Sequence, residues 1–424
     1  MKKILAIVLG ILMSLSCFSF IACGEDSGTK REPVALADVK VGLICLHGEE
    51  STYDKNFIHA MKTAMSDLGM SESQLVMRTG VPESNDCYEA AVDMAEQGCQ
   101  VIFADSFGHE SHIIKAAKEF PNVEFCHATG TKEIVEKLSN FHNAFASIYE
   151  GRYLAGVVAG LKLKDMIDNN TLPTTHKREN GKYIVGYVGA WPYAEVKSGY
   201  TSWFLGIQHA LEGTDIDVTM KVKFTSSWYD ESAEKSTAEN LISAGAAIVS
   251  QHADSMGAPT MCESKGVPNV SYNGSTASEC SETFLVSSRI NWAPYFKHMI
   301  NAIVDGTAIK TNYVGTLQDG SVVLTELGEN VAPGTAEKVA EVKAQLEAGT
   351  LKVFDVSKFT VDGKHLTESL ADVIDKGDYE ADTNVIRTKN GITYFDESDP
   401  ELRSAPYFAL DIDGIQILTG TTAK

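Results

Sequence analysis

The chain has 424 residues, of which 36 are lysine or arginine and 57 are aspartate or glutamate, giving a net charge of −21. With 44% hydrophobic residues it has enough apolar side chains for folded domains, which excludes a mainly disordered protein. The acidic excess argues against a nucleic-acid partner and against loose docking on anionic lipid, because both need clustered lysine and arginine. The length predicts about two or three compact units.

The first residues have the pattern of an export signal. Lys2 and Lys3 precede an apolar run over residues 4–13, and small and apolar residues continue to Ala22. This run is too short to span a membrane comfortably. We therefore expect residues 1–22 to be a signal peptide and the mature protein to be exported.

The predicted signal ends at a cysteine. Phe20-Ile21-Ala22 stand before Cys23 and resemble a bacterial lipobox, in which the cysteine is diacylated and becomes the new N-terminus. Cys17 offers an earlier site, and a plain cleaved signal is the alternative reading. We favour lipidation at Cys23, which would make residues 23–37 a tether to the cell membrane, in the periplasm or on the outer face.

The remaining cysteines do not predict a metal site. Export permits disulfides, and six thiols allow 15 full pairings, so the sequence leaves the pairing open. Cys45 and Cys126 lie in apolar runs and are expected in the core. Without a CxxC or a Cys/His spacing, we expect no metal and no cofactor. No later segment reaches about 18 uninterrupted apolar residues, the length of a membrane span.

From Lys40 onward, short apolar runs alternate with helical stretches. Strands are expected over residues 41–46, 74–78, 101–104 and 123–127, and helices over 57–68, 86–97 and 111–119. Such alternation predicts an α/β fold, with βαβ units, right-handed crossovers and a parallel sheet covered on both faces.

The same alternation then restarts. Strands are expected over residues 183–189, 218–224, 247–251 and 268–272, and helices over 149–163, 196–211, 231–244 and 336–347. Two α/β lobes facing each other create a cleft, and open sheets of this kind bind ligands at the carboxyl ends of their strands. The role of the tail after Leu366 is left open.

Four short segments resemble the basic membrane protein family of bacterial lipoproteins. They begin at Tyr149, Gly186, Ser227 and Gln251 and read YEGRYLAG, GYVGAWP, SWYD and QHADS. The resemblance covers roughly residues 40–366. It implies a monomeric solute-binding component of an ATP-binding-cassette importer, with a purine nucleoside or a related compound as ligand and a permease as partner.

The resemblance also implies the type I periplasmic-binding-protein fold, in which two Rossmann-like lobes are joined by three hinge crossovers. We place the crossovers near residues 146, 288 and 314. The N-terminal lobe would then comprise residues 38–146 and 289–314. The C-terminal lobe would comprise residues 147–288 and 315–424, including a C-terminal extension.

A purine receptor needs aromatic walls with polar groups between them, because a purine has two flat faces and an edge of mixed donors and acceptors. The candidates lie just beyond strand ends. In the first lobe they are Tyr53, Asp54, Asn56, Phe57, Asp105, Ser106 and Phe107. In the second lobe they are Trp191, Trp228, His252, Asp254 and Asn273. For Phe57 the alternative to ligand contact is a position in the core, and for His252 it is a structural role.

Two departures from the family leave the choice between base and nucleoside open. The family's early Asp-Lys-Ser-Phe-Asn loop reads Asp-Lys-Asn-Phe-Ile from Asp54, so the asparagine is displaced to Asn56. An aspartate that binds ribose hydroxyls in nucleoside receptors falls on Asn273, which lacks a charged pair of acceptor oxygens. We therefore retain both ligands.

Enzymatic readings have less support. The sequence has no GxSxG elbow, HExxH motif or Walker A pattern, so we expect a receptor without catalytic residues. The alternatives are a nucleoside-cleaving hydrolase at the cell surface and a sensor or adhesive lipoprotein on the same fold.

Overall fold

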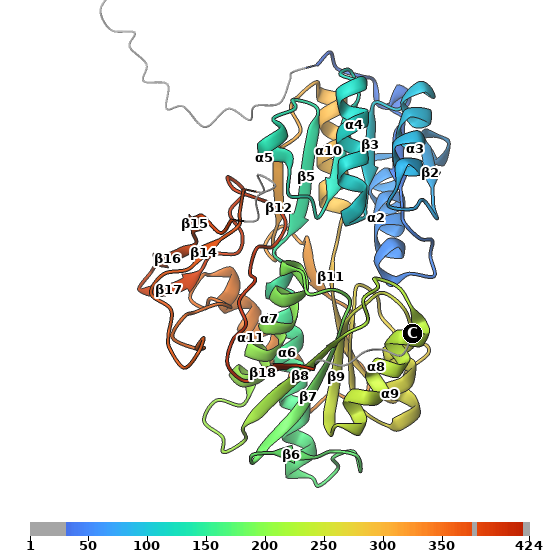
Figure 1. Ribbon diagram of the computed structural model, residues 1–424. Helices are drawn as coiled ribbons and strands as arrows, with labels where there is room; N and C mark the ends of the chain where they lie inside the picture. Colours follow the sequence, from blue (N-terminus) through green and yellow to red (C-terminus); the bar gives the residue numbers. More distant parts are fainter. Residues whose placement is uncertain (1–30, 375–379, 419–424) are drawn as a thin grey trace, which may run out of the picture.

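Two α/β lobes, one above the other, make up the computed structural model, which describes residues 31–374 and 380–418 (Figure 1). The predicted α/β fold with parallel sheets is confirmed. The predicted signal peptide and Cys23 lie outside the described residues. Within those ranges, no helix combines the length and the apolar character needed to cross a membrane.

The first lobe is built on a six-stranded parallel sheet with the order β12-β5-β4-β3-β1-β2. Its strands are β1 (Val41–Ile44), β2 (Leu75–Arg78), β3 (Val101–Ala104), β4 (Glu124–Ala128), β5 (Phe141–Ala146) and β12 (Asn312–Gly315). Its helices are α2 (Thr52–Leu68), α3 (Asn85–Glu96), α4 (Glu110–Glu119), α5 (Glu133–Glu136) and α10 (Ala293–Asp305), with short 3-10 turns η1 (Leu36–Asp38), η2 (Glu72–Gln74) and η3 (Phe107–His109).

The central strands β1, β3, β4 and β5 of this sheet are buried on both faces, so their side chains alternate between two cores. Val101 and Phe103 of β3 belong to the core that α2 and α10 cover. Ile102 and Ala104 of the same strand belong to the core under α3 and α4. The near-continuous apolar runs that predicted these strands reflect this double burial.

The second lobe contains a mostly parallel sheet with the order β13-β11-β10-β9-β7-β8-β18, in which β13 is antiparallel to β11. Its strands are β6 (Arg178–Glu179), paired with β7 (Lys182–Gly189), then β8 (Val218–Phe224), β9 (Ala246–His252), β10 (Asn269–Tyr272), β11 (Phe284–Ile290), β13 (Val322–Leu324) and β18 (Ile415–Ile417). Its helices are α6 (Ile148–Asp168), α7 (Ala194–Ala210), α8 (Glu231–Ser243), α9 (Gly257–Lys265) and α11 (Thr335–Glu347).

Helices α6 and α7 pack unusually close together. A Cβ atom at Gly156 would collide with the carbonyl oxygen of Trp203, and one at Gly206 would collide with the carbonyl oxygen of Tyr153. Only glycine lets the two backbones approach to this distance. The small residues along the predicted helix at 149–163 therefore serve the contact between two helices.

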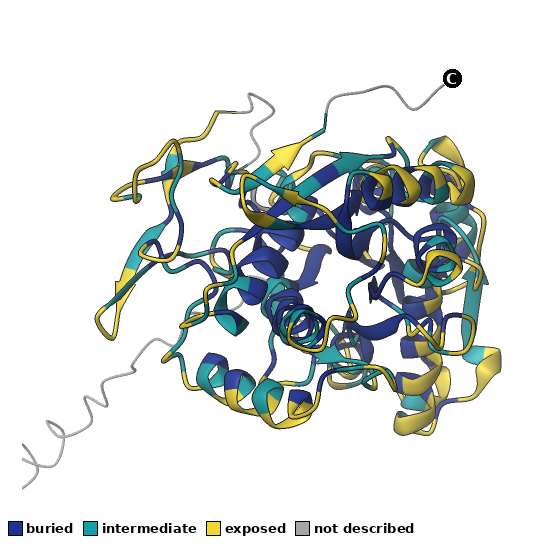
Figure 2. Cartoon of the chain, turned by 90° about the horizontal axis from the view of Figure 1, so that it is seen from below, coloured by how far each residue is buried: buried dark blue, intermediate teal, exposed yellow. Residues whose placement is uncertain are grey.

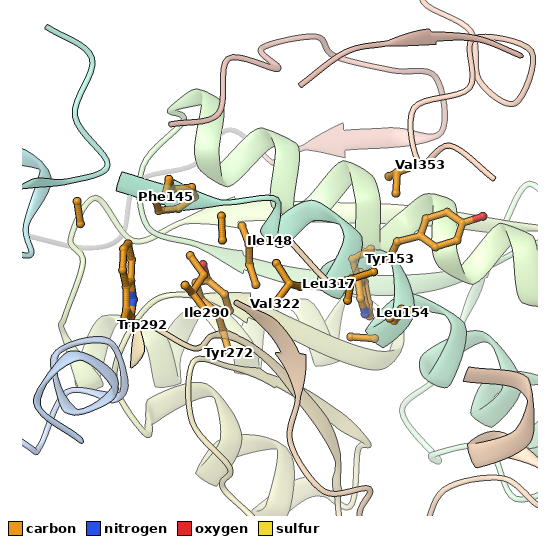
Figure 3. Packing of buried hydrophobic residues seen from close by; sticks show 14 of the residues in the cluster. Phe145, Ile148, Tyr153, Leu154, Tyr272, Ile290, Trp292, Leu317, Val322 and Val353 are labelled. Carbon is orange, nitrogen blue, oxygen red and sulfur yellow. The ribbon is translucent and has the colours of Figure 1, made fainter. Parts of the chain in front are cut away.

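The chain passes between the sheets three times, between β5 and α6, between β11 and α10, and between β12 and β13. Figure 3 shows Phe145 and Ile148 of the first passage near Ile290 and Trp292 of the second. The rings of Phe145 and Trp292 lie 6.2 Å apart. The hinge is therefore a packed apolar core as well as a set of connecting strands.

The tail wraps the second lobe and reaches the hinge. It contains β14 (Leu370–Ala371), β15 (Thr383–Asn384), β16 (Ile386–Lys389) and β17 (Ile392–Phe395) before β18. Phe354 and Phe408 stack with ring centroids 4.3 Å apart, and the Ser398 hydroxyl donates to the Tyr149 oxygen at 3.2 Å. In Figure 2, much of this segment is exposed at the periphery, whereas the central strands of the sheets are buried. The sequence pattern had left this tail unassigned.

One helix begins earlier than the sequence pattern predicted. The helix expected from residue 57 begins at Thr52, because the Ser51 side chain caps it by accepting a hydrogen bond from the Asp54 amide. Tyr53, Asp54 and Phe57 therefore lie on the first turns of α2. Strands β5 and β11 and helix α10 were not predicted.

All six cysteines of the described residues are unpaired and buried: Cys45, Cys87, Cys99, Cys126, Cys262 and Cys280. Cys45 and Cys126 lie in the core, as predicted. Burial raises the pKa values of these thiols, so they remain protonated and unreactive at neutral pH.

Candidate functional site

A cavity lies between the lobes, beyond the carboxyl ends of strands from both sheets, and its empty space of about 410 Å³ includes open solvent. The first lobe contributes Leu46, His47, Tyr53, Asp54, Ser106, Phe107 and Thr129. The second lobe contributes Glu195, Trp228, His252, Asp254 and Tyr272. The arrangement suits a ligand that touches both lobes at once.

The structure gathers seven of the predicted site residues around this cavity, namely Tyr53, Asp54, Ser106, Phe107, Trp228, His252 and Asp254. They come from segments up to about 200 positions apart in the chain. Their positions just beyond strand ends were the signal that predicted them to share one site. Asp105 lies directly behind them, since its carbonyl oxygen accepts a hydrogen bond from the Tyr53 hydroxyl at 2.7 Å.

The predicted site residues Phe57 and Trp191 lie outside the cavity lining. Phe57 is fully buried and stacks on Trp292 with ring centroids 4.4 Å apart. It thus has the core position that the sequence analysis gave as the alternative to ligand contact. Trp191 is half-buried and stacks on Tyr193 at 6.1 Å.

The two asparagines of the prediction line a second, wider groove between the lobes. Asn56 donates to the carbonyl oxygen of Ile290 at 2.5 Å and accepts from the Arg289 guanidinium at 3.2 Å. Asn273 is buried in the left-handed region, with φ at 64°, and its side-chain nitrogen has no hydrogen-bond partner among the described residues. The structure thus separates Asn273 from Tyr272, its neighbour, which faces the cavity.

Five residues of the lining were not among the predicted site residues: Leu46, His47, Thr129, Glu195 and Tyr272. His47 comes directly after the predicted strand over residues 41–46, and Thr129 directly follows β4, so a consistent use of strand ends would have found both. Leu46 was counted as part of that predicted strand. Tyr272 is the last residue of β10 and was counted as strand. Glu195 lies in the first turn of α7, where the helix dipole favours a carboxylate whether or not it binds a ligand.

Aromatic side chains from both lobes meet beside the cavity. Phe107 of the first lobe and Tyr193 of the second lie 5.5 Å apart between ring centroids, and both are partly exposed. Tyr193 in turn lies 6.0 Å from Trp228. Rings at such separations attract each other through offset and tilted contacts. This row of rings connects the lobes at the cavity.

The carboxyl groups of the first lobe are held firmly in place. Asp54 accepts hydrogen bonds from the His47 amide at 2.7 Å and from the Ser51 hydroxyl at 2.6 Å. Asp105 accepts from the Leu46 amide at 3.1 Å. Burial and the neighbouring Asp54 raise the pKa of Asp105 well above its usual value.

Asp54, Asp105 and Cys45 form a buried cluster whose possible ligand atoms lie within 4.8 Å of one another. Burial raises the pKa of the Cys45 thiol, as it raises that of Asp105. Raised pKa values favour the neutral forms of both groups.

A hydrogen-bonded chain orients Glu195 in the second lobe. Burial and then Arg152 lower the pKa of His252 to about 4, so its ring is neutral. The Tyr187 hydroxyl lies 3.4 Å from its Nδ1 atom, and its Nε2 atom lies 3.3 Å from Oε1 of Glu195. A neutral ring that accepts from Tyr187 donates through Nε2, which fixes the Glu195 carboxylate beside the cavity.

Arg152 supplies positive charge behind the cavity. It is fully buried, its guanidinium carbon lies 3.6 Å from the ring centroid of Tyr272, and its nitrogens have no hydrogen-bond partner among the described residues. A cation over an aromatic face is attracted by the ring. Burial and the nearby Asp54, Glu234 and Glu195 raise the pKa of Asp254, and Arg152 opposes this effect.

The family model described as PnrA-like ABC transporter substrate-binding protein matches residues 43–352. Among curated proteins, a purine-binding protein of Brucella abortus is 30% identical over 319 residues, covering 74% of this chain and 83% of that protein. A putative ABC transporter glucose-binding protein of Haloferax volcanii is 27% identical over 311 residues, covering 70% of this chain and 73% of the relative.

Solved structures of solute-binding proteins share the fold. A protein of an ABC transporter system from Conexibacter woesei has a TM-score of 0.56 at 20% identity, covering 74% of this chain and 98% of its own. A counterpart from Aeropyrum pernix has a TM-score of 0.57 at 16% identity, covering 77% and 94%. The architecture implied by the resemblance, that of periplasmic solute-binding proteins, is confirmed.

Proposed function

The chain belongs to the Bmp family of PnrA-like ABC transporter substrate-binding proteins, and on that premise we propose that it captures a purine base or purine nucleoside and delivers it to a permease. The observation that carries the proposal is the interlobe cavity, in which aromatic side chains stand beside polar ones. Tyr53, Phe107, Trp228 and Tyr272 offer rings for the flat faces of a purine, and Asp254 and Glu195 offer groups for its edge. The name of the Brucella relative supports the same ligand class.

The receptor acts as a monomer tethered to the membrane. Lipid on Cys23 would hold it near its permease, since confinement raises the effective concentration of a partner. The described residues begin at Arg31, at the end of the first lobe that faces away from the cavity. Arg31 donates to the carbonyl oxygen of Pro121 at 3.1 Å and pairs with Glu124, at the amino-terminal end of the central strand β4. A tether at this end of the lobe leaves the cleft accessible.

Thermal unfolding with a panel of ligands tests the proposal. A ligand that binds only the folded state raises the melting temperature, and the stabilisation grows with the logarithm of the ratio of ligand concentration to dissociation constant. Purine bases and nucleosides should raise it, whereas pentoses, glucose and amino acids should not. A response to glucose alone would contradict the purine proposal and favour the ligand named for the Haloferax relative.

The proposal treats the protein as a receptor without catalysis, in line with the solute-binding description of its relatives. Purified protein incubated with inosine or adenosine should leave the nucleoside intact. Chromatography that detected free base above a control without protein would instead support a nucleoside-cleaving hydrolase.

A further inference from the structure

The tail from residue 353 onward lies beyond the stretch that the family model matches. It is fastened to the second lobe along one side of that lobe (Figure 1). Phe354 packs on Tyr149 of α6 with ring centroids 5.3 Å apart, and the Asp411 carboxylate lies 2.7 Å from the Lys197 ammonium of α7. Strand β18 adds a parallel strand to β8. The tail is therefore expected to move with the second lobe.

A buried arginine fixes the part of the tail that reaches the hinge. Arg403 is 7% exposed, and its guanidinium donates to carbonyl oxygens of the tail, including that of Asp372 at 2.9 Å. Hydrogen bonds from a charged donor are stronger than those between neutral groups. The Tyr407 hydroxyl donates to the carbonyl oxygen of Asp396, two residues before Ser398. These contacts hold Ser398 in one place against the hinge.

Ser398 bonds to both sides of the first crossover between the lobes. Its hydroxyl oxygen lies 2.9 Å from that of Ser147, and it donates to the Tyr149 oxygen at 3.2 Å. Because the single hydroxyl hydrogen of Ser398 points to Tyr149, the Ser147 hydroxyl is the donor of the other bond. Ser147 immediately precedes α6, and Tyr149 lies in the first turn of that helix. One tail side chain thus contacts both neighbours of Ile148.

The backbone of Ser147 is tied to the first lobe. Its amide donates at 2.8 Å to the carbonyl oxygen of Gly315, the last residue of β12 in the first sheet. Its ψ angle of 53° lies outside the strand and helix regions. Hinge motion is absorbed by a few residues at the ends of such elements. A bond from Ser147 to a tail that is fastened on the second lobe therefore bridges the two lobes.

We infer that the tail restrains the hinge in the closed arrangement through the bond between Ser398 and Ser147, and that it thereby slows ligand release. Rotation of the lobes away from each other moves Ser147 relative to the tail and breaks this bond. A contact that only the closed form makes shifts the balance between open and closed forms toward the closed one. The effect on ligand release rests on the proposed function, whereas the effect on the shape of the ligand-free protein does not.

Ser398→Ala removes the bond and retains the other contacts of the tail. Release of adenine or adenosine, measured by stopped flow, should be about two- to tenfold faster than in the natural chain, the change expected from one hydrogen bond. Small-angle X-ray scattering without ligand should show a larger radius of gyration. Ser357→Ala is the matched control, because the Ser357 side chain is exposed and bonds to Asp355 within the tail.

A double-mutant cycle with Ser147→Ala tests the bond itself. The two substitutions remove the same contact, so release from the double variant should be little faster than from either single variant. Melting temperatures without ligand show that the variants fold. Unchanged release and unchanged scattering in a folded Ser398→Ala variant would overturn the inference. If neither adenine nor adenosine binds, the proposed function fails, and the scattering comparison alone decides whether the tail restrains the hinge.

Discussion

The Thr52 amide donates a hydrogen bond to the carbonyl oxygen of Asp254 at 3.0 Å, and the Thr52 hydroxyl reaches the same oxygen at 3.2 Å. Thr52 is the first residue of α2 in one lobe, and Asp254 follows β9 in the other. The described structure is therefore a closed arrangement of the lobes. Because Asp254 also presents its carboxyl group to the cavity, closure and the placement of that group are coupled.

The two half-buried tryptophans should differ in their effect on binding. Trp228 lines the cavity and Trp191 does not, although the sequence pattern predicted both as ligand contacts. Trp228→Ala should weaken purine binding by about 1–3 kcal/mol, the range for stacking of a base on an aromatic side chain. Trp191→Ala should change affinity much less. Calorimetry on both variants measures the loss of purine affinity. Equal losses would show that the contact area extends beyond the described cavity.

Phe57→Ala should lower stability more than affinity. Its ring is fully buried against Trp292 and lies 5.6 Å from Phe103. Truncation of such a phenylalanine leaves a cavity and lowers the free energy of unfolding by about 3–5 kcal/mol. Urea unfolding measures this loss. A stable variant with much weaker purine binding would instead place Phe57 in the binding site.

Phe107→Ala should speed ligand release with little loss of stability. Phe107 is 39% exposed and meets Tyr193 of the other lobe. Removal of this contact disfavours the closed arrangement, so stopped-flow dissociation should be faster. In a double-mutant cycle, Phe107→Ala and Tyr193→Ala should show a coupling of about 0.5–1.5 kcal/mol. Strictly additive effects would argue against a contact between the lobes.

Stability should fall as the pH rises toward 8, in part because of Glu397. Burial raises the pKa of this tail residue to about 8, so the folded chain holds a proton that the unfolded chain has released. Stability decreases with pH wherever the folded state binds more protons. Its contribution is complete below the ordinary glutamate pKa of about 4.3 and is lost as the pH rises through about 8.

Glu397→Gln should therefore reduce the difference in unfolding free energy between pH 5.5 and pH 8, measured by urea titration. Glu401→Gln is the matched control, because Glu401 is exposed in the same segment. Part of the slope should remain, since burial also raises the pKa values of Glu150 and Glu234 to about 7. An unchanged slope in Glu397→Gln would contradict the assignment.

Cys23→Ser should release the mature protein from the membrane. Without the thiol there is no site for the diacyl group, and no described helix could replace it as an anchor. Partitioning into detergent measures the change. If Cys23→Ser partitions as the natural chain does, attachment does not depend on lipid at Cys23, and Cys17→Ser becomes the informative variant.

Sequence patterns predicted the positions of helices and strands better than the contacts between them. Apolar runs located β1 and β3, and strand ends located Asp54 and Asp254, because both signals are local. The stacking of Phe57 on Trp292 is not local, since nothing in either segment shows which face meets the other. The early start of α2 was readable, because Ser51 stands three positions before Asp54 in a capping pattern.

The edge strand β18 also constrains the order in which the protein can fold during synthesis. Ile415 pairs with Met220, and the first lobe takes β12 and α10 from positions that follow most of the second lobe. At about 5–20 residues per second, β8 waits on the order of ten to forty seconds for β18. An open strand edge is a template for pairing with other chains. The nascent chain therefore has a prolonged interval in which it is exposed to misassembly.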